Sequence, residues 1–117
     1  MKFSVERVPS VDRDVADILN FLIESYRSFG DDEEAALARA ADRVRKIEEA
    51  MPSLGNPTHQ GTKREDLAPG VRSVTKNRAI YYFDVNEHRR VLRILAVFFG
   101  GQDHTRRMLQ RLLISRH

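Results

Sequence analysis

The sequence predicts an α+β fold in which an antiparallel sheet is covered by a hairpin of two helices. In the first half of the chain, apolar residues recur at the three- and four-residue spacing of one helical face over two long segments. In the second half they alternate with polar residues or form short continuous runs, as in strands. A length of 117 residues suits one domain, which we expect to span residues 1–117.

Three elements are expected in the first half. They are a strand over Lys2–Val8, a helix over about Val11–Phe29 and a helix over about Asp32–Met51. Ser10 and Asp31 are placed to cap the two helices, because their side chains accept hydrogen bonds from free amides at a helix start. Gly30 adopts positive φ readily and should end the first helix. The short connection makes the helices antiparallel neighbours, with Phe29 and Leu37 in their apolar stripes.

The second half predicts three strands and a last helix after a long loop over residues 52–70. The expected strands are Val71–Thr75, Ala79–Val85 and Val91–Phe99, and the helix covers about residues 103–115. Short turns make these strands an antiparallel meander, which the first strand joins, in the order β-α-α-β-β-β-α. The last strand is almost continuously apolar, so we expect both of its faces to be largely covered.

Composition excludes several kinds of site. The chain has no Cys, which removes disulfides, thiolate zinc sites and cysteine nucleophiles. Its four His lack metal-ligand spacing and it has no phosphate-binding glycine motif, so we expect neither a metal nor a cofactor. There is no apolar run of membrane-spanning length and no apolar signal core at the N-terminus. These features predict a cytoplasmic protein without a membrane partner.

Charge is divided unevenly along the chain. Residues 1–51 carry a net charge of −4 and residues 52–117 a net charge of +7. An acidic half joined to a basic half suggests two surfaces with different partners. A solvated basic face is the alternative, and direct binding of nucleic acid stays open.

Two segments of the second half resemble a known family. They are Gly61–Arg72 and Ile94–Asp103, which are similar to the basic loop before the second strand and to the end of the last strand in RelE/ParE toxins. The likeness is to the ParE, or plasmid stabilisation, branch of these bacterial type II toxin–antitoxin proteins. The order and size of the predicted helical hairpin agree with it.

The resemblance implies a toxin that is neutralised by a ParD-like antitoxin and that binds DNA gyrase. Two alternatives stay open: a RelE-type ribosome-dependent mRNA endoribonuclease, and a degenerate member that has lost its toxicity. If the chain is a nuclease, Arg72 and His104 are the main candidates for the catalytic groups. Gly100 and Gly101 stand where the nuclease branch tends to carry a basic or acid–base residue, and no Tyr follows Tyr82. These absences favour binding over catalysis.

The candidate contact residues form two groups. Those for the target are basic residues of the loop and of the last helix: Lys63, Arg64, Arg72, Arg106, Arg107 and Arg111, with Arg116 in the same helix. Those for the antitoxin are Leu19, Tyr26, Arg78 and Arg93.

Each group also has a plainer interpretation. The loop cations can be solvated, with Arg72 bonded to loop carbonyls, and Glu65 and Asp66 reduce the positive field beside them. Arg93 interrupts an apolar strand, so it either pairs with an acid such as Asp84 or faces a groove used by a partner. The run Tyr81–Phe83 is interpreted as core rather than as a base-stacking surface. The last helix can equally pack Met108, Leu109, Leu112 and Leu113 on the body and leave its arginines in water.

Overall fold

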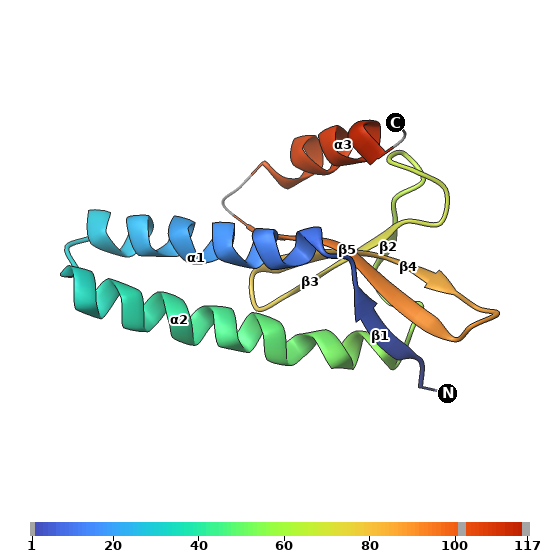
Figure 1. Ribbon diagram of the computed structural model, residues 1–117, viewed down its shortest axis with the longest axis horizontal. Coiled ribbons are helices and arrows are strands. Elements are labelled where there is room, and N and C mark those ends of the chain that lie inside the picture. Colours follow the sequence, from blue (N-terminus) through green and yellow to red (C-terminus); the bar gives the residue numbers. More distant parts are fainter. Residues whose placement is uncertain (1, 101–102, 116–117) are drawn as a thin grey trace.

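The computed structural model describes residues 2–100 and 103–115, and it confirms the α+β class (Figure 1). Its elements are, in order, β1 (Ser4–Arg7), α1 (Ser10–Ser28), α2 (Glu33–Ala50), the 3₁₀ turn η1 (Met51–Gly55), β2 (Thr62–Lys63), β3 (Arg72–Lys76), β4 (Ala79–Asn86), β5 (Val91–Phe99) and α3 (His104–Ser115). Gly101, Gln102 and Arg116 of the sequence predictions lie outside the described residues.

The strands form one sheet in the order β1-β5-β4-β3-β2. The meander of β3, β4 and β5 is antiparallel, as predicted, and β1 joins it as a parallel neighbour of β5. The two-residue strand β2 was not predicted, because its pairing with β3 is set by the return of the long loop. Gly61 permits this return: it has φ +78°, and a Cβ there would lie 2.2 Å from the carbonyl oxygen of Ser73.

The helical hairpin forms as predicted, but its caps differ. Ser10 is the first residue of α1 and makes no side-chain cap. The cap of α2 is Asp32 instead of Asp31, and its Oδ1 accepts a hydrogen bond from the backbone N–H of Ala35 at 2.8 Å. Asp31 makes an ion pair with Arg39 at 2.6 Å instead. Gly30 has φ +106°, the left-handed conformation expected after the end of α1.

Two apolar layers cover the two faces of the sheet. The larger layer lies between the sheet and the hairpin and includes Val11, Ile18, Leu22, Ile47, Tyr81, Phe83 and Ile94. The smaller layer lies on the opposite face, beneath α3 and the loop, and includes Leu67, Val71, Ile80, Tyr82, Phe98 and Met108. Strands β4 and β5 are therefore covered on both faces, and Tyr81, Tyr82 and Phe83 are all core residues.

Four apolar side chains that were expected to pack on the body are exposed instead. Phe29 and Leu37 lie near the connected end of the hairpin, which projects beyond the sheet, and they are 87% and 49% exposed (Figure 1). On α3, Met108 is buried and Leu112 is half-buried, whereas Leu109 and Leu113 are exposed. Periodicity identifies the apolar stripe of a helix, but it does not show how much of that stripe the rest of the fold covers.

Candidate functional site

Lys63 and Arg72 lie together at the edge of the sheet. They are opposite each other in the β2–β3 pairing, so their side chains share a face. Both line a shallow groove of about 240 Å³, together with His59, Glu65 and Glu87. Arg72 Nη1 donates to the carbonyl oxygen of His59 at 3.4 Å. This is the bond to a loop carbonyl that was the alternative to target binding for Arg72.

Arg64 is separated from these two residues and joins the apolar layer beneath α3. Its Nε and Nη2 donate to the two carboxylate oxygens of Asp66 at 3.0 and 2.9 Å. Its Nη1 lies 3.3 Å from the hydroxyl of Tyr82. The hydrogen bonds to Asp66 raise the pKa of Arg64, and those from Arg64 lower the pKa of Asp66. The charge of Arg64 is therefore largely balanced within the chain.

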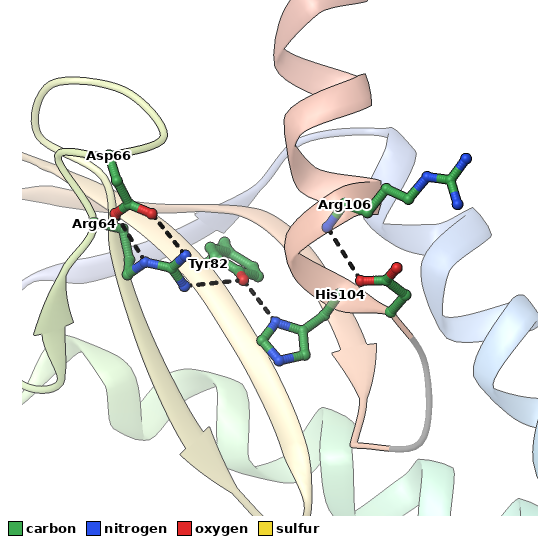
Figure 2. A network of polar contacts seen from close by, with 6 residues as sticks. Arg64, Asp66, Tyr82, His104 and Arg106 are labelled. Carbon is green, nitrogen blue, oxygen red and sulfur yellow. Dashed lines mark hydrogen bonds and ion pairs between the residues drawn. The ribbon is translucent and has the colours of Figure 1, made fainter.

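The hydroxyl of Tyr82 connects Arg64 to the start of α3 (Figure 2). It lies 2.7 Å from Nδ1 of His104, the first residue of that helix. The tyrosine is completely buried and contacts the ring of Phe98 edge-on. Sequence reasoning missed this group, because Tyr82 and His104 are 22 residues apart and nothing in their spacing signals contact. A histidine, a phenol and a guanidinium thus meet at one point, but the phenol has no exposed surface.

Arg106 and Arg107 remain at the surface of α3. Both side chains are exposed, and the backbone N–H of Arg106 donates to a carboxylate oxygen of Asp103 at 3.4 Å (Figure 2). Within the described residues neither guanidinium makes an ion pair. These two cations, with Lys63 and Arg72, are the target candidates that the fold leaves accessible.

Arg111, by contrast, holds α3 to the body. Its Nη1 donates to Asp14 Oδ2 at 2.7 Å and to the carbonyl oxygen of Leu95 at 3.2 Å. Asp14 is only 2% exposed and also accepts a hydrogen bond from the backbone N–H of Val97. The hydrogen bonds to Asp14 raise the pKa of Arg111. While α3 is docked, this guanidinium is hydrogen-bonded within the chain.

The Asp14–Arg111 pair also bonds to the backbone of β5 beyond the point where β1 ends. Tyr82 pairs with Ala96 and Phe83 with Ile94, so Leu95 is an extra residue on β5, a β-bulge. The pairing with β1 ends at Ile94, which leaves the later part of β5 without a strand on that side. Arg111 and Asp14 bond to the backbone on either side of Ala96 in place of a strand.

The four candidate antitoxin residues lie in three parts of the fold. Leu19 and Tyr26 are half-buried in the hairpin layer, and Arg39 stacks on the Tyr26 ring with its Cζ 4.1 Å from the centroid. Arg78 occupies the β3–β4 turn at φ 65°. Arg93 lies on β5 and pairs with Asp84 at 2.9 Å, as predicted, while both residues also line a groove beside α3. Sequence reasoning foresaw the pair and the groove as alternatives, and the structure contains both.

The described residues contain no cluster of three or more His, Cys, Asp or Glu that could hold a metal ion. No helix in the described ranges is long and apolar enough to cross a lipid bilayer.

Comparison with solved structures identifies the architecture. No family model and no curated protein matches the sequence. A chain of the chromosomal ParDE toxin–antitoxin system from P. aeruginosa superposes with a TM-score of 0.62 at 20% identity, covering 84% of this chain and 96% of that one. The chain has the RelE/ParE fold. A chain of the RelBE2 toxin–antitoxin complex from Mycobacterium tuberculosis superposes with a TM-score of 0.56 at 12% identity, covering 85% of this chain and 99% of that one.

Proposed function

We propose that the chain is the toxin of a bacterial type II toxin–antitoxin system, that it acts by binding its target, and that a ParD-like antitoxin neutralises it. The observation that carries the proposal is the RelE/ParE fold, which extends over most of this chain and over almost all of each compared chain. DNA gyrase is the proposed target, because the two resembling segments are of the ParE type. We also propose that the protein is located in the cytoplasm, which is consistent with this target.

The state of the polar groups favours binding over RNA cleavage. Cleavage needs a base for the 2′-hydroxyl and cations free to hold a phosphate. Tyr82 is completely buried, and the Nε/Nη2 edge of the Arg64 guanidinium is paired with Asp66 while its Nη1 contacts the Tyr82 hydroxyl. Arg72 lies opposite Lys63 in the β2–β3 pairing, whereas His104 contacts Tyr82 beneath α3, and this separate placement supports a binding role over a joint catalytic one.

The target surface is proposed to consist of the accessible cations Lys63, Arg72, Arg106 and Arg107. The double variant Lys63→Glu/Arg106→Glu tests it, because both side chains are exposed and neither makes an ion pair in the described residues. The matched control is Arg27→Glu, an exposed arginine in the last turn of α1. We expect the double variant, but not the control, to weaken growth arrest by about tenfold or more.

The deciding experiment is induced expression in a bacterial host with and without the adjacent gene. Growth arrest, rescue by the adjacent gene, intact mRNA and inhibited supercoiling by purified gyrase would support the proposal. Arrest with intact gyrase activity would refute gyrase as the target. No arrest at any expression level would point to a degenerate toxin.

A RelE-type ribonuclease is the second candidate, and one observation favours it. The Tyr82 hydroxyl lies 2.7 Å from His104 Nδ1 and 3.3 Å from Arg64 Nη1, and an imidazole, a phenol and a guanidinium are groups that can take part in proton transfer. Mapping of mRNA 5′ ends after induction separates the two functions. Codon-linked cleavage that is lost in His104→Ala and in Tyr82→Phe would establish the nuclease, whereas a binding toxin leaves mRNA ends unchanged in all three proteins.

A further inference from the structure

The helix α3 is apolar on two sides. Its inner side buries Met108 and half-buries Leu112 against the sheet. Its outer side exposes Leu109, Leu113 and Ile114 by 41%, 61% and 74%, which are three of the five exposed large apolar side chains in the described ranges. An amphipathic helix normally buries one apolar stripe, and the described part of this fold leaves these three apolar side chains uncovered.

The same outer side carries positive charge alone. Among its twelve residues α3 has no acidic side chain. Arg106 and Arg107 are exposed, and in the described part of the chain no carboxylate pairs with them. Arg111 does not add to this surface, because Asp14 already balances its charge. An approaching partner therefore meets two arginines beside three apolar side chains.

A groove extends this surface toward α1. It has a volume of about 800 Å³, and α3 contributes Arg107, Gln110 and Ile114 to its wall. Arg13 of α1 lines the groove as well, and Leu95 and Phe98 of β5 are among the apolar residues that it contacts. Because Ile114 belongs to both the groove and the outer side of α3, one elongated element can contact both.

We propose that the outer side of α3, defined by Arg106, Arg107, Leu109, Leu113 and Ile114, is a docking surface for an acidic amphipathic helix of a partner protein. The inference rests on the proposed function, in which that partner is the antitoxin. The partner's apolar residues pack on Leu113 and Ile114, and its carboxylates lie beside Arg106 and Arg107. Charge complementarity selects this occupant.

A second copy of the chain fits the surface less well. Two α3 helices packed together would bring four exposed arginines into one interface with no carboxylate on either helix. An anionic membrane is also a poor fit, because binding to a bilayer surface scales with buried apolar area and only three apolar side chains are offered.

The test compares the full chain with the double variant Leu113→Gln/Ile114→Gln, using the protein encoded by the adjacent gene as the probe. Both positions are exposed and glutamine is a good helix former, so the variant should keep its fold. We expect binding, measured by calorimetry, to weaken by about 10- to 100-fold, because two apolar side chains no longer leave water. Leu37→Gln, at an exposed apolar position on α2, is the matched control and should bind like the unaltered chain.

The charge component is tested with Arg106→Glu/Arg107→Glu against Arg27→Glu. We expect Arg106→Glu/Arg107→Glu to weaken binding by about tenfold or more and Arg27→Glu to leave it unchanged. Raised salt should weaken the binding of the unaltered chain.

Each other outcome overturns the inference in a different way. If the unaltered chain does not bind the adjacent protein, the proposed function fails and the docking surface fails with it. If it binds but Leu113→Gln/Ile114→Gln binds equally well, the docking surface alone is wrong. A dimer in light scattering that the α3 variant converts to a monomer would make a second copy the occupant. If the unaltered chain floats with phosphatidylglycerol vesicles and the α3 variant does not, the occupant of the surface would be a membrane.

Discussion

Replacement of Arg111 by Met should destabilise the protein more than any other single change of a surface-reaching cation. The side chain of Arg111 is 27% exposed, and its partner Asp14 is 2% exposed. Arg111→Met keeps most of the apolar volume of the side chain and removes both hydrogen bonds to the carboxylate. Among the described residues, the buried carboxylate of Asp14 then keeps the hydrogen bond from the backbone N–H of Val97.

The expected cost follows from this geometry. Removal of one partner of a buried ion pair costs about 3–5 kcal/mol, because the remaining charge is uncompensated. Because Asp14 lies at the wall of the groove beside α3, we expect the lower end of this range, about 3 kcal/mol. For a domain of this size the loss corresponds to a fall in Tm of about 10–20 °C. The double variant Asp14→Asn/Arg111→Met carries no buried charge and should recover at least about 1 kcal/mol.

The assay is urea unfolding followed by far-ultraviolet circular dichroism, with the free energy extrapolated to water. Arg93→Met is the matched control, since Arg93 and Asp84 form a similar pair with side chains 54% and 30% exposed. That variant should lose less than about 1 kcal/mol. The reasoning would be refuted if Arg111→Met cost no more than Arg93→Met, or if the double variant were no more stable than Arg111→Met.

Three further predictions concern stability. Asp32→Ala should cost about 1 kcal/mol in urea unfolding, since it leaves the N–H of Ala35 without its cap. Tyr81→Phe should cost about 1–2 kcal/mol, because the Tyr81 hydroxyl donates to the buried carbonyl oxygen of Ile47 at 2.7 Å. Arg64 lowers the pKa of Asp66 below its ordinary value of 3.8. The contribution of Asp66 is therefore present above that value and lost as the pH falls through the lower folded pKa. The difference in urea midpoint between the unaltered chain and Asp66→Asn should be constant from about pH 6 to 8 and should shrink below about pH 4.

The pattern of apolar residues was enough to predict the element order and the two-sided burial of β5. Local chemistry was less reliable, as the caps of the hairpin show. Asp31 and Asp32 are adjacent and of the same type, and either can cap a helix. Asp32 directly precedes the first residue of α2, whereas the backbone N–H of Asp31 bonds to the carbonyl oxygen of Tyr26 at the end of α1 and its side chain pairs with Arg39. Those partners lie five and eight positions away, so no motif at the helix start contains the information.

In the candidate site, too, the sequence identified the residues but not which of them lie together. Sequence reasoning grouped Lys63, Arg64 and Arg72 as one basic cluster. Pairing of β2 with β3 places Lys63 opposite Arg72, while Arg64 contacts Tyr82 in the layer beneath α3. The difference arises because β2 ends at Lys63 and Arg64 follows it, and β2 was too short to be recognised as a strand.

The sequence by itself determined the α+β class, the helical hairpin and the meander, since periodicity records which side chains must leave water. Only the tertiary structure decided which polar groups meet. The Asp14–Arg111 pair spans 97 positions and the Tyr82–His104 contact spans 22. Such contacts depend on the bulge at Leu95 and on the docking of α3, and both are properties of the assembled layers that no local stretch of sequence encodes.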